Sequence, residues 1–264
     1  MEGLAAMRRM VPAAILAGIL AGTLAAKAQI RVAAAADLQP VLPPILAQFE
    51  QATGVQAEAT YQASAMLTTE IENGAPFDVF LSADLSYPKR LIDAGVADAA
   101  GSADSTTPIT YAMGTLVLWE RKNAHLPPPS LELLRSAALQ RLAIANPDRA
   151  PYGRAAIATL RNLKLYDALK PRLVTAENIA QTAQFADSGN ADAGLISLTS
   201  ALTPRLRAEG TYFVIPRELY PPIAQGAVIV SSTKQRPAVH KLLDFLLSPA
   251  VQAELARSGL TPAR

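Results

Sequence analysis

The chain has 264 residues, of which half are hydrophobic, 17% are charged and none is cysteine. The formal net charge is only +2, which argues against nucleic acid or an anionic membrane surface as the partner, because both select strongly basic surfaces. The absence of cysteine from the sequence excludes disulfides, thiolate metal sites and a cysteine nucleophile.

The N-terminal segment has the composition of a secretory signal peptide. Arg8 and Arg9 precede an uncharged stretch at 10–26, which ends in a small-x-small cleavage pattern at Ala26 and Ala28. The apolar stretch is shorter than the about 20 residues that a membrane-spanning helix needs. We therefore expect export and cleavage after Ala28, which leaves 236 residues with equal numbers of basic and acidic side chains. The alternative is that the segment is retained, as the anchor of a membrane-bound interaction protein.

Strand-like apolar runs alternate with segments of helical periodicity in the first part of the mature chain. In chain order they predict a strand at 30–35, a helix at 38–53, a strand at 55–61, a helix at 65–72, a strand at 78–81 and a helix at 87–94. Gly54, Gly74 and Gly95 follow the three helices, as glycine commonly does at a helix C-terminus. Pro43 and Pro44 are compatible with the first helix only in its first turn.

The alternation continues after a long β-rich stretch at 109–120. In chain order we expect a short helix at 130–136, a strand at 142–145, helices at 154–163, 166–173 and 179–187, strands at 193–197, 211–215 and 227–231, and helices at 237–247 and 249–258. This order predicts an α/β fold with mostly parallel sheets flanked by helices. The long β stretch and the late strand passage predict two lobes joined by a two-strand hinge. We expect lobe 1 at 29–109 plus 221–264, and lobe 2 at 110–220.

The sequence contains none of the common motifs of nucleophilic, zinc-dependent or nucleotide-dependent enzymes. Its only histidines are His125 and His240, and neither has a neighbour at the spacing of metal ligands. We therefore expect a protein that is not an enzyme. The alternative from another class is an exported serine hydrolase that uses Ser64 as nucleophile, with Asp37 in support.

Four loops share small or polar residues at the end of a strand, followed by the start of a helix. They lie at 33–37, 62–65, 146–154 and 177–179. The first N–H groups of a helix have no acceptor within it, and the helix dipole adds a partial positive charge at that end. Several helix starts that converge can therefore bind an anion without Lys or Arg. Each loop alone also fits an ordinary helix cap, so the prediction of an anion site depends on all four together.

Five segments, in order along the chain, resemble the periplasmic molybdate-binding proteins of ABC transporters, and the resemblance extends over nearly the whole mature chain. They read V-A-A-A-A-D-L at 32–38, Q-A-S-A-M-L at 62–67, N-G-A-P-F-D-V-F-L-S-A-D at 73–84, A-N-P-D-R-A-P-Y-G-R-A-A at 145–156 and E-N-I-A-Q-T-A-Q-F at 177–185. The resemblance implies a two-lobed type II binding protein whose cleft holds molybdate or tungstate and presents it to a membrane permease. We expect a periplasmic monomer that needs no cofactor. Sulfate or phosphate is the alternative oxyanion.

Carried over position by position, the resemblance assigns six residues as contacts of the oxyanion. These residues would contact its metal atom only through the oxyanion. They are Ala36, Asp37, Ser64, Tyr152, Ile179 and Ser197. Ser64 would donate its hydroxyl, and Tyr152 and Ile179 would donate backbone N–H groups. Ser197 stands where many members of the family have a tyrosine.

The first loop departs from the family, because many members have a serine where this chain has Ala36 or Asp37. A carboxylate that faces a dianion repels it unless the carboxylate is protonated or paired. Either Asp37 caps the helix that follows and points away, so that only the backbone amides bind, or it faces the cleft. In the cleft it would pair with Arg154 or accept a proton from a protonated oxyanion, which would favour phosphate. Arg154 is thus a possible accessory residue, and an ordinary exposed arginine is the alternative.

Overall fold

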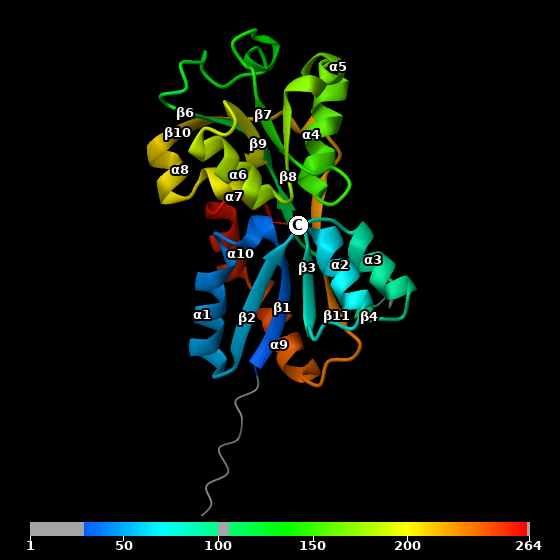
Figure 1. The fold of residues 1–264 in the computed structure, drawn as a ribbon. Helices are drawn as coiled ribbons and strands as arrows, with labels where there is room; N and C mark the ends of the chain where they lie inside the picture. The colour runs from blue at the N-terminus through cyan, green and yellow to red at the C-terminus, as the bar shows by residue number, and fades with distance from the viewer. Residues whose placement is uncertain (1–28, 100–105, 263–264) are drawn as a thin grey trace, which may run out of the picture.

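Two β-sheets with helices packed against both faces make up the computed structural model, which describes residues 29–99 and 106–262 (Figure 1). The predicted signal peptide at 1–28 lies outside these residues, so its cleavage stays a prediction. Within the two described ranges, no helix has the length and apolar character needed to cross a membrane.

The first sheet has six strands, which are β1 (Gln29–Ala35), β2 (Gln56–Gln62), β3 (Val79–Ser82), β4 (Ala97–Ala99), β5 (Ile109–Gly114) and β11 (Ile223–Val230). Their order is β2-β1-β3-β11-β4, and β5 also pairs with β11. β1 is parallel to β2 and β3. β11 is antiparallel to β3, β4 and β5.

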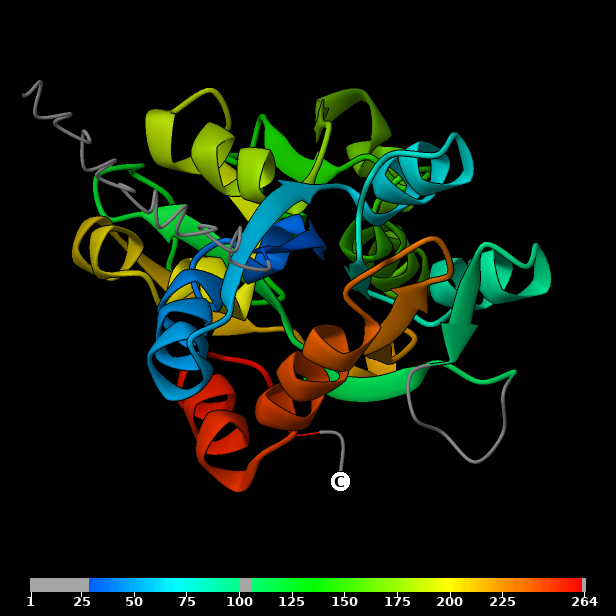
Figure 2. The same ribbon diagram turned by 90° about the horizontal axis from the view of Figure 1, so that it is seen from below.

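Five helices cover the first sheet, which are α1 (Leu42–Thr53), α2 (Ser64–Glu72), α3 (Ser86–Asp93), α9 (Arg236–Leu246) and α10 (Pro249–Arg257). Alternate residues of β1 point to opposite faces of the sheet. Ile30 and Val32 join a core with α1, α9 and α10, and Ala33 joins a separate core with α2 and α3. Figure 2 shows α1, α9 and α10 together on one side of the molecule and α3 on the opposite side.

The second sheet has five strands, which are β6 (Leu116–Arg121), β7 (Leu142–Ala145), β8 (Leu173–Ala176), β9 (Ala193–Ser197) and β10 (Gly210–Val214). Their order is β10-β6-β9-β7-β8. β7 is parallel to β8 and β9, whereas β6 is antiparallel to β9 and β10.

Helices also pack on both faces of the second sheet, and they are α4 (Pro151–Asn162), α5 (Tyr166–Leu169), α6 (Ile179–Ser188), α7 (Leu198–Ala201) and α8 (Pro204–Glu209). Leu118 and Ile144 pack with Leu160 of α4 on one face. On the other face, Trp119 packs with Ala186 of α6 and with α7 and α8. The central strands β3, β7, β9 and β11 are therefore buried on both sides, which explains why they read as nearly continuous apolar runs, whereas β2 and β10 at the sheet edges are more exposed.

The chain crosses between the sheets twice, at Thr115 and again at 215–222. The crossings lie side by side, because β5 pairs with β11 in the first sheet and β6 pairs with β10 in the second. The predicted two-lobed α/β fold is confirmed, but each sheet mixes parallel and antiparallel pairs. The reason is that β11 and β6, which enter from the other sheet, run opposite to their neighbours. The lobe limits at 109/110 and 220/221 stay a prediction, and the strand pairing favours Thr115 as the first limit.

The largest local differences from the sequence prediction concern where helices begin. The predicted helix at 38–53 is instead a 3-10 turn, η1 (Ala36–Leu38), followed by α1, so that Pro43 and Pro44 lie in the first turn of α1. α4 begins at Pro151 rather than at residue 154, again with proline in the first turn.

The structure also contains elements that local pattern did not reveal. The predicted helix at 166–173 is divided among α5, a 3-10 turn and the first residue of β8. The short elements β4, α7 and α8 were not predicted. The remaining 3-10 turns among the described residues are η2 (Leu133–Arg135), η3 (Lys170–Arg172) and η4 (Arg217–Leu219). β8 matters most, because it carries the fourth predicted loop to the edge of the second sheet.

Candidate functional site

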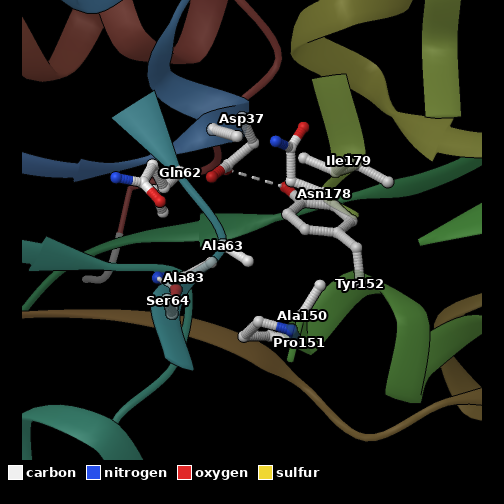
Figure 3. A pocket seen from close by; sticks show the side chains of 12 residues that line it. Asp37, Gln62, Ala63, Ser64, Ala83, Ala150, Pro151, Tyr152, Asn178 and Ile179 are labelled. Carbon is white, nitrogen blue, oxygen red and sulfur yellow. Dashed lines mark hydrogen bonds between the residues drawn. The ribbon is translucent and has the colours of Figure 1, made fainter. Parts of the chain in front are cut away.

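The four loops predicted from the sequence meet in one small pocket between the two sheets (Figure 3). They connect β1 to η1 and β2 to α2 in the first sheet, and β7 to α4 and β8 to α6 in the second. Since β1 is parallel to β2 and β7 to β8, each pair brings two loops to the same sheet edge. The pocket is lined by Ala35, Ala36, Asp37, Gln62, Ala63, Ser64, Ala83, Ala150, Pro151, Tyr152, Asn178 and Ile179.

Ser64 begins α2 and is buried in the pocket wall. Its Oγ accepts the backbone N–H of Ala83 at 3.1 Å, which fixes the hydroxyl and leaves its proton to donate to a ligand. The next amide of the helix, that of Ala65, donates across to the carbonyl of Arg149 at 3.2 Å. The start of α2 therefore contacts the loop before α4, and Ser64 lies beside this contact between the two sheets.

Tyr152 and Ile179 lie in the first turns of α4 and α6, where N–H groups have no acceptor within the helix. In α4, the following amide of Gly153 donates to Ala150 at 2.9 Å, and in α6 the side chain of Asn178 caps the first turn. Among the described residues, no acceptor is found for the N–H of Tyr152 or of Ile179. Both amides are therefore placed so that they could donate to an anion, and their role in binding stays a prediction.

Two glycines permit the close approaches that build this pocket. A Cβ on Gly153 would clash with the carbonyl of Ala145, so only glycine lets the first turn of α4 pack against the end of β7. A Cβ on Gly114 would clash with the Tyr152 hydroxyl, so the last residue of β5 leaves room for that side chain. The sequence analysis singled out neither glycine as a site residue.

Asp37 is fully buried and faces the pocket, which decides between the two alternatives left open by the sequence. The Tyr152 hydroxyl donates to its Oδ2 at 3.1 Å, and the Nε2 of Gln225 donates to the same oxygen. Its Oδ1 is buried and has no hydrogen-bond partner among the described residues. Burial raises the pKa of Asp37 to about 6, although the hydrogen bonds from Gln225 and Tyr152 favour the charged form.

The expectation that Asp37 pairs with Arg154 is wrong. Arg154 extends from α4 to the first sheet, where it forms an ion pair with Asp84 and donates to the Tyr87 hydroxyl at 3.1 Å. Its guanidinium also lies over the Tyr87 ring, at 5.3 Å from the centroid. The side chain is exposed and lies outside the pocket lining, so its charge links the two sheets at the rim of the pocket.

Of the six residues assigned to the oxyanion, Ser197 is the one that the structure places outside the pocket lining, as it does the accessory candidate Arg154. It ends β9 and caps α7, because its Oγ accepts the N–H of Ser200 at 3.3 Å and lies 2.9 Å from the Thr199 hydroxyl. Its hydroxyl is engaged in this local network. We therefore do not carry Ser197 into the proposed site.

Gln225 is a functional candidate that the sequence analysis missed. It is fully buried in β11, where every other residue except Gly226 is apolar, and its amide holds Asp37 in place. A single glutamine in the run I-A-Q-G-A-V-I-V was the available signal, because a buried amide is costly without partners: its Nε2 has Asp37, and its Oε1 has none among the described residues.

The pocket offers hydrogen-bond donors and no fixed cation. None of its lining residues is Lys, Arg or His, and among the described residues no group of three or more His, Cys, Asp or Glu is placed to hold a metal ion. His125 and His240 are not in the lining, so Ser64 has no histidine base beside it, as the serine hydrolase alternative would need. Helix N-termini, which carry the positive end of the helix dipole, are what this pocket offers to an anion in place of a cation.

A family model described as bacterial extracellular solute-binding protein matches residues 30–261. The chain belongs to this family. This solute-binding protein is 38% identical over 233 residues to the molybdate-binding protein ModA of Azotobacter vinelandii, which covers 88% of this chain and 89% of that relative. It is 36% identical over 235 residues to ModA of Rhodobacter capsulatus, which covers 89% of both chains.

The fold is also shared with a solved structure, the periplasmic molybdate-binding protein of Azotobacter vinelandii. The TM-score is 0.80 at 30% identity, and the match covers 89% of this chain and 100% of that one. The resemblance read from the sequence is therefore confirmed. These relatives are named for binding an oxyanion and not for catalysis, in agreement with the expectation that the chain is not an enzyme.

We predict that Arg154→Ala weakens oxyanion binding by less than about fivefold, since exposed ion pairs contribute about 0.2–1 kcal/mol. A direct charged hydrogen bond to the ligand would contribute about 1.5–3 kcal/mol, and its loss would cost tenfold or more. Calorimetric titration distinguishes the two. Arg161→Ala is the matched control, because Arg161 lies on the same helix with its guanidinium over the Tyr166 ring. A loss of affinity above tenfold for Arg154→Ala, but not for Arg161→Ala, would instead show that the Arg154 guanidinium contacts the ligand directly.

Proposed function

We propose that this solute-binding protein captures molybdate or tungstate in the pocket between the two sheets and presents it to the membrane permease of an ABC transporter. The observation that carries the proposal is the convergence of donors from both sheets on one small pocket without a cation in its lining. A tetrahedral dianion needs several donors from different directions, and helix N-termini provide them. The ModA proteins to which the chain is similar are named for this ligand.

Binding and closure are coupled in this arrangement. The first sheet contributes the Ser64 hydroxyl, and the second contributes the amides of Tyr152 and Ile179, so one anion bridges both. An anion that contacts donors on both sheets favours the closed arrangement by its differential affinity. Direct hydrogen bonds already join the sheets around the pocket, for example from Thr199 Oγ1 to the carbonyl of Asp37 at 2.7 Å.

We also infer that the chain acts as a periplasmic monomer after cleavage at Ala28. The basic and apolar character of the N-terminal segment supports this, together with the extracellular family to which the chain belongs. N-terminal sequencing of the exported protein should begin at Gln29, and sedimentation should give the mass of one chain. A sequence that begins at Met1 in membrane fractions would instead support an anchored protein.

We predict that calorimetric titration detects tight binding of molybdate and tungstate and much weaker binding of sulfate and phosphate. Molybdate and tungstate have nearly the same size and charge, so backbone donors distinguish them poorly. Sulfate is smaller, and donors fixed on two sheets do not all reach it at once. Tight phosphate binding without molybdate binding would overturn the proposed ligand.

We predict that Ser64→Ala weakens molybdate binding by about 10-fold to 100-fold, because a hydrogen bond to a charged group contributes about 1.5–3 kcal/mol. The same titration measures this loss. Thr69→Ala is the matched control on the same helix, because its hydroxyl bonds only to the carbonyl of Ala65, outside the pocket lining. Equal affinities for the two variants would remove Ser64 from the site, and ester turnover abolished by Ser64→Ala would support the hydrolase alternative.

A further inference from the structure

We propose that Asp37 determines the specificity of the anion site by carrying a proton on Oδ1, which it donates to the bound dianion, so that each molybdate is bound together with one proton. This inference rests on the proposed function. It concerns the first loop, where the chain has Ala36 and Asp37 and, by the resemblance, lacks the serine of many molybdate-binding proteins.

The geometry assigns different roles to the two oxygens of Asp37. Oδ2 accepts two hydrogen bonds, from the Tyr152 hydroxyl and from the Gln225 amide. Oδ1 is also buried, but it accepts no hydrogen bond from the described residues, although the Asp37 side chain lines the pocket. A buried polar atom without a partner is costly, and a bound oxyanion is the group that would satisfy it. If Oδ1 carries the proton, it becomes a further donor in a site built from donors.

The surroundings of Asp37 provide no charge that would keep it ionised beside a dianion. It is faced by Tyr152 from α4, Tyr111 from β5 and Gln225 from β11. Burial raises the pKa of both tyrosines well above the ordinary value, so they stay neutral donors. Arg154 is paired with Asp84 outside the pocket lining. A carboxylate and a dianion together in this pocket would repel each other with no cation between them.

The expected sign of the pH dependence follows from these charges. Burial raises the pKa of Asp37 to about 6 in the structure without ligand, so at neutral pH the carboxyl is mostly ionised before binding. The negative charge of the anion raises that pKa further, and the carboxyl therefore takes up a proton when the anion binds. By linkage, the affinity for a dianion should fall by up to about tenfold for each pH unit above about 6.

The proton on Asp37 would also distinguish two classes of oxyanion. Molybdate and sulfate are dianions without a proton at neutral pH, and both need Asp37 as donor. Hydrogen phosphate carries its own proton and needs Asp37 as acceptor, so it would bind without proton uptake. Asp37→Asn keeps the shape of the side chain and has an N–H group that can donate to the anion. The amide does not titrate, and its nitrogen cannot accept a hydrogen bond from hydrogen phosphate.

The experiment is titration of the wild-type protein with sodium molybdate in buffers of different ionisation enthalpy, near pH 7. The slope of observed heat against buffer ionisation enthalpy gives the number of protons taken up, and we expect a value close to one per anion. Asp37→Asn should bind molybdate without proton uptake, with an affinity that is constant between about pH 6 and 8. Uptake close to zero in the wild-type protein, with pH-independent affinity, would overturn the inference.

Glu120→Gln is the matched control, because Glu120 is the other buried carboxyl whose pKa burial raises, to about 7, and it is not in the pocket lining. This variant should retain the full proton uptake, and loss of uptake here would overturn the assignment to Asp37. If Asp37→Asn fails to fold, the proton uptake of the wild-type protein and of Glu120→Gln still tests the inference. Binding of molybdate without protons contradicts only this inference, whereas no molybdate binding at any pH contradicts the proposed function itself.

Discussion

The constraint on which the rest of this structure depends is the parallel pairing of β1 with β2 and of β7 with β8. Parallel strands end at the same edge of a sheet, so each pair places two loops and their following helix or turn side by side. The two edges face each other across the double crossing at Thr115 and 215–222. The Ser64 hydroxyl of the first sheet and main-chain N–H groups of the second therefore meet at one pocket, which has no basic side chain in its lining.

Tyr152 connects the main-chain hydrogen-bond donors of the pocket to the buried carboxyl of Asp37. Its backbone N–H lies in the first turn of α4, and its hydroxyl reaches Asp37 in the first sheet. Gly114 leaves room for that hydroxyl at the point where the chain leaves the first sheet, and Gln225 on the returning strand β11 holds the same carboxyl. Both halves and the crossing region thus meet at Asp37, so under the proposal its protonation would affect ligand choice and closure together.

Local sequence pattern was sufficient for the architecture and for the four loops, because strand periodicity, helix starts and capping glycines depend on near neighbours. It was not sufficient for side-chain partners. The two donors to Asp37 lie 115 and 188 residues away in the chain, and the carboxylate that pairs with Arg154 lies 70 residues away. The start of α4 at Pro151 was missed because the residues before Arg154 also read as a loop, although proline in a first turn was a usable signal.

The contacts between the two sheets differ in environment, and this difference assigns them different roles. The Arg154–Asp84 pair is at the rim and partly exposed, so water and salt weaken it whether the pocket is filled or empty. The contacts of Asp37 are fully buried, where an unsatisfied Oδ1 and an uncompensated charge are both costly. In the proposed site, an anion that accepts a hydrogen bond from the protonated carboxyl would remove both costs at once, and only when Ser64, Tyr152 and Ile179 are close enough to donate as well. On this proposal the rim pair would adjust the ease of closure, while the buried carboxyl would make closure depend on the identity of the ligand.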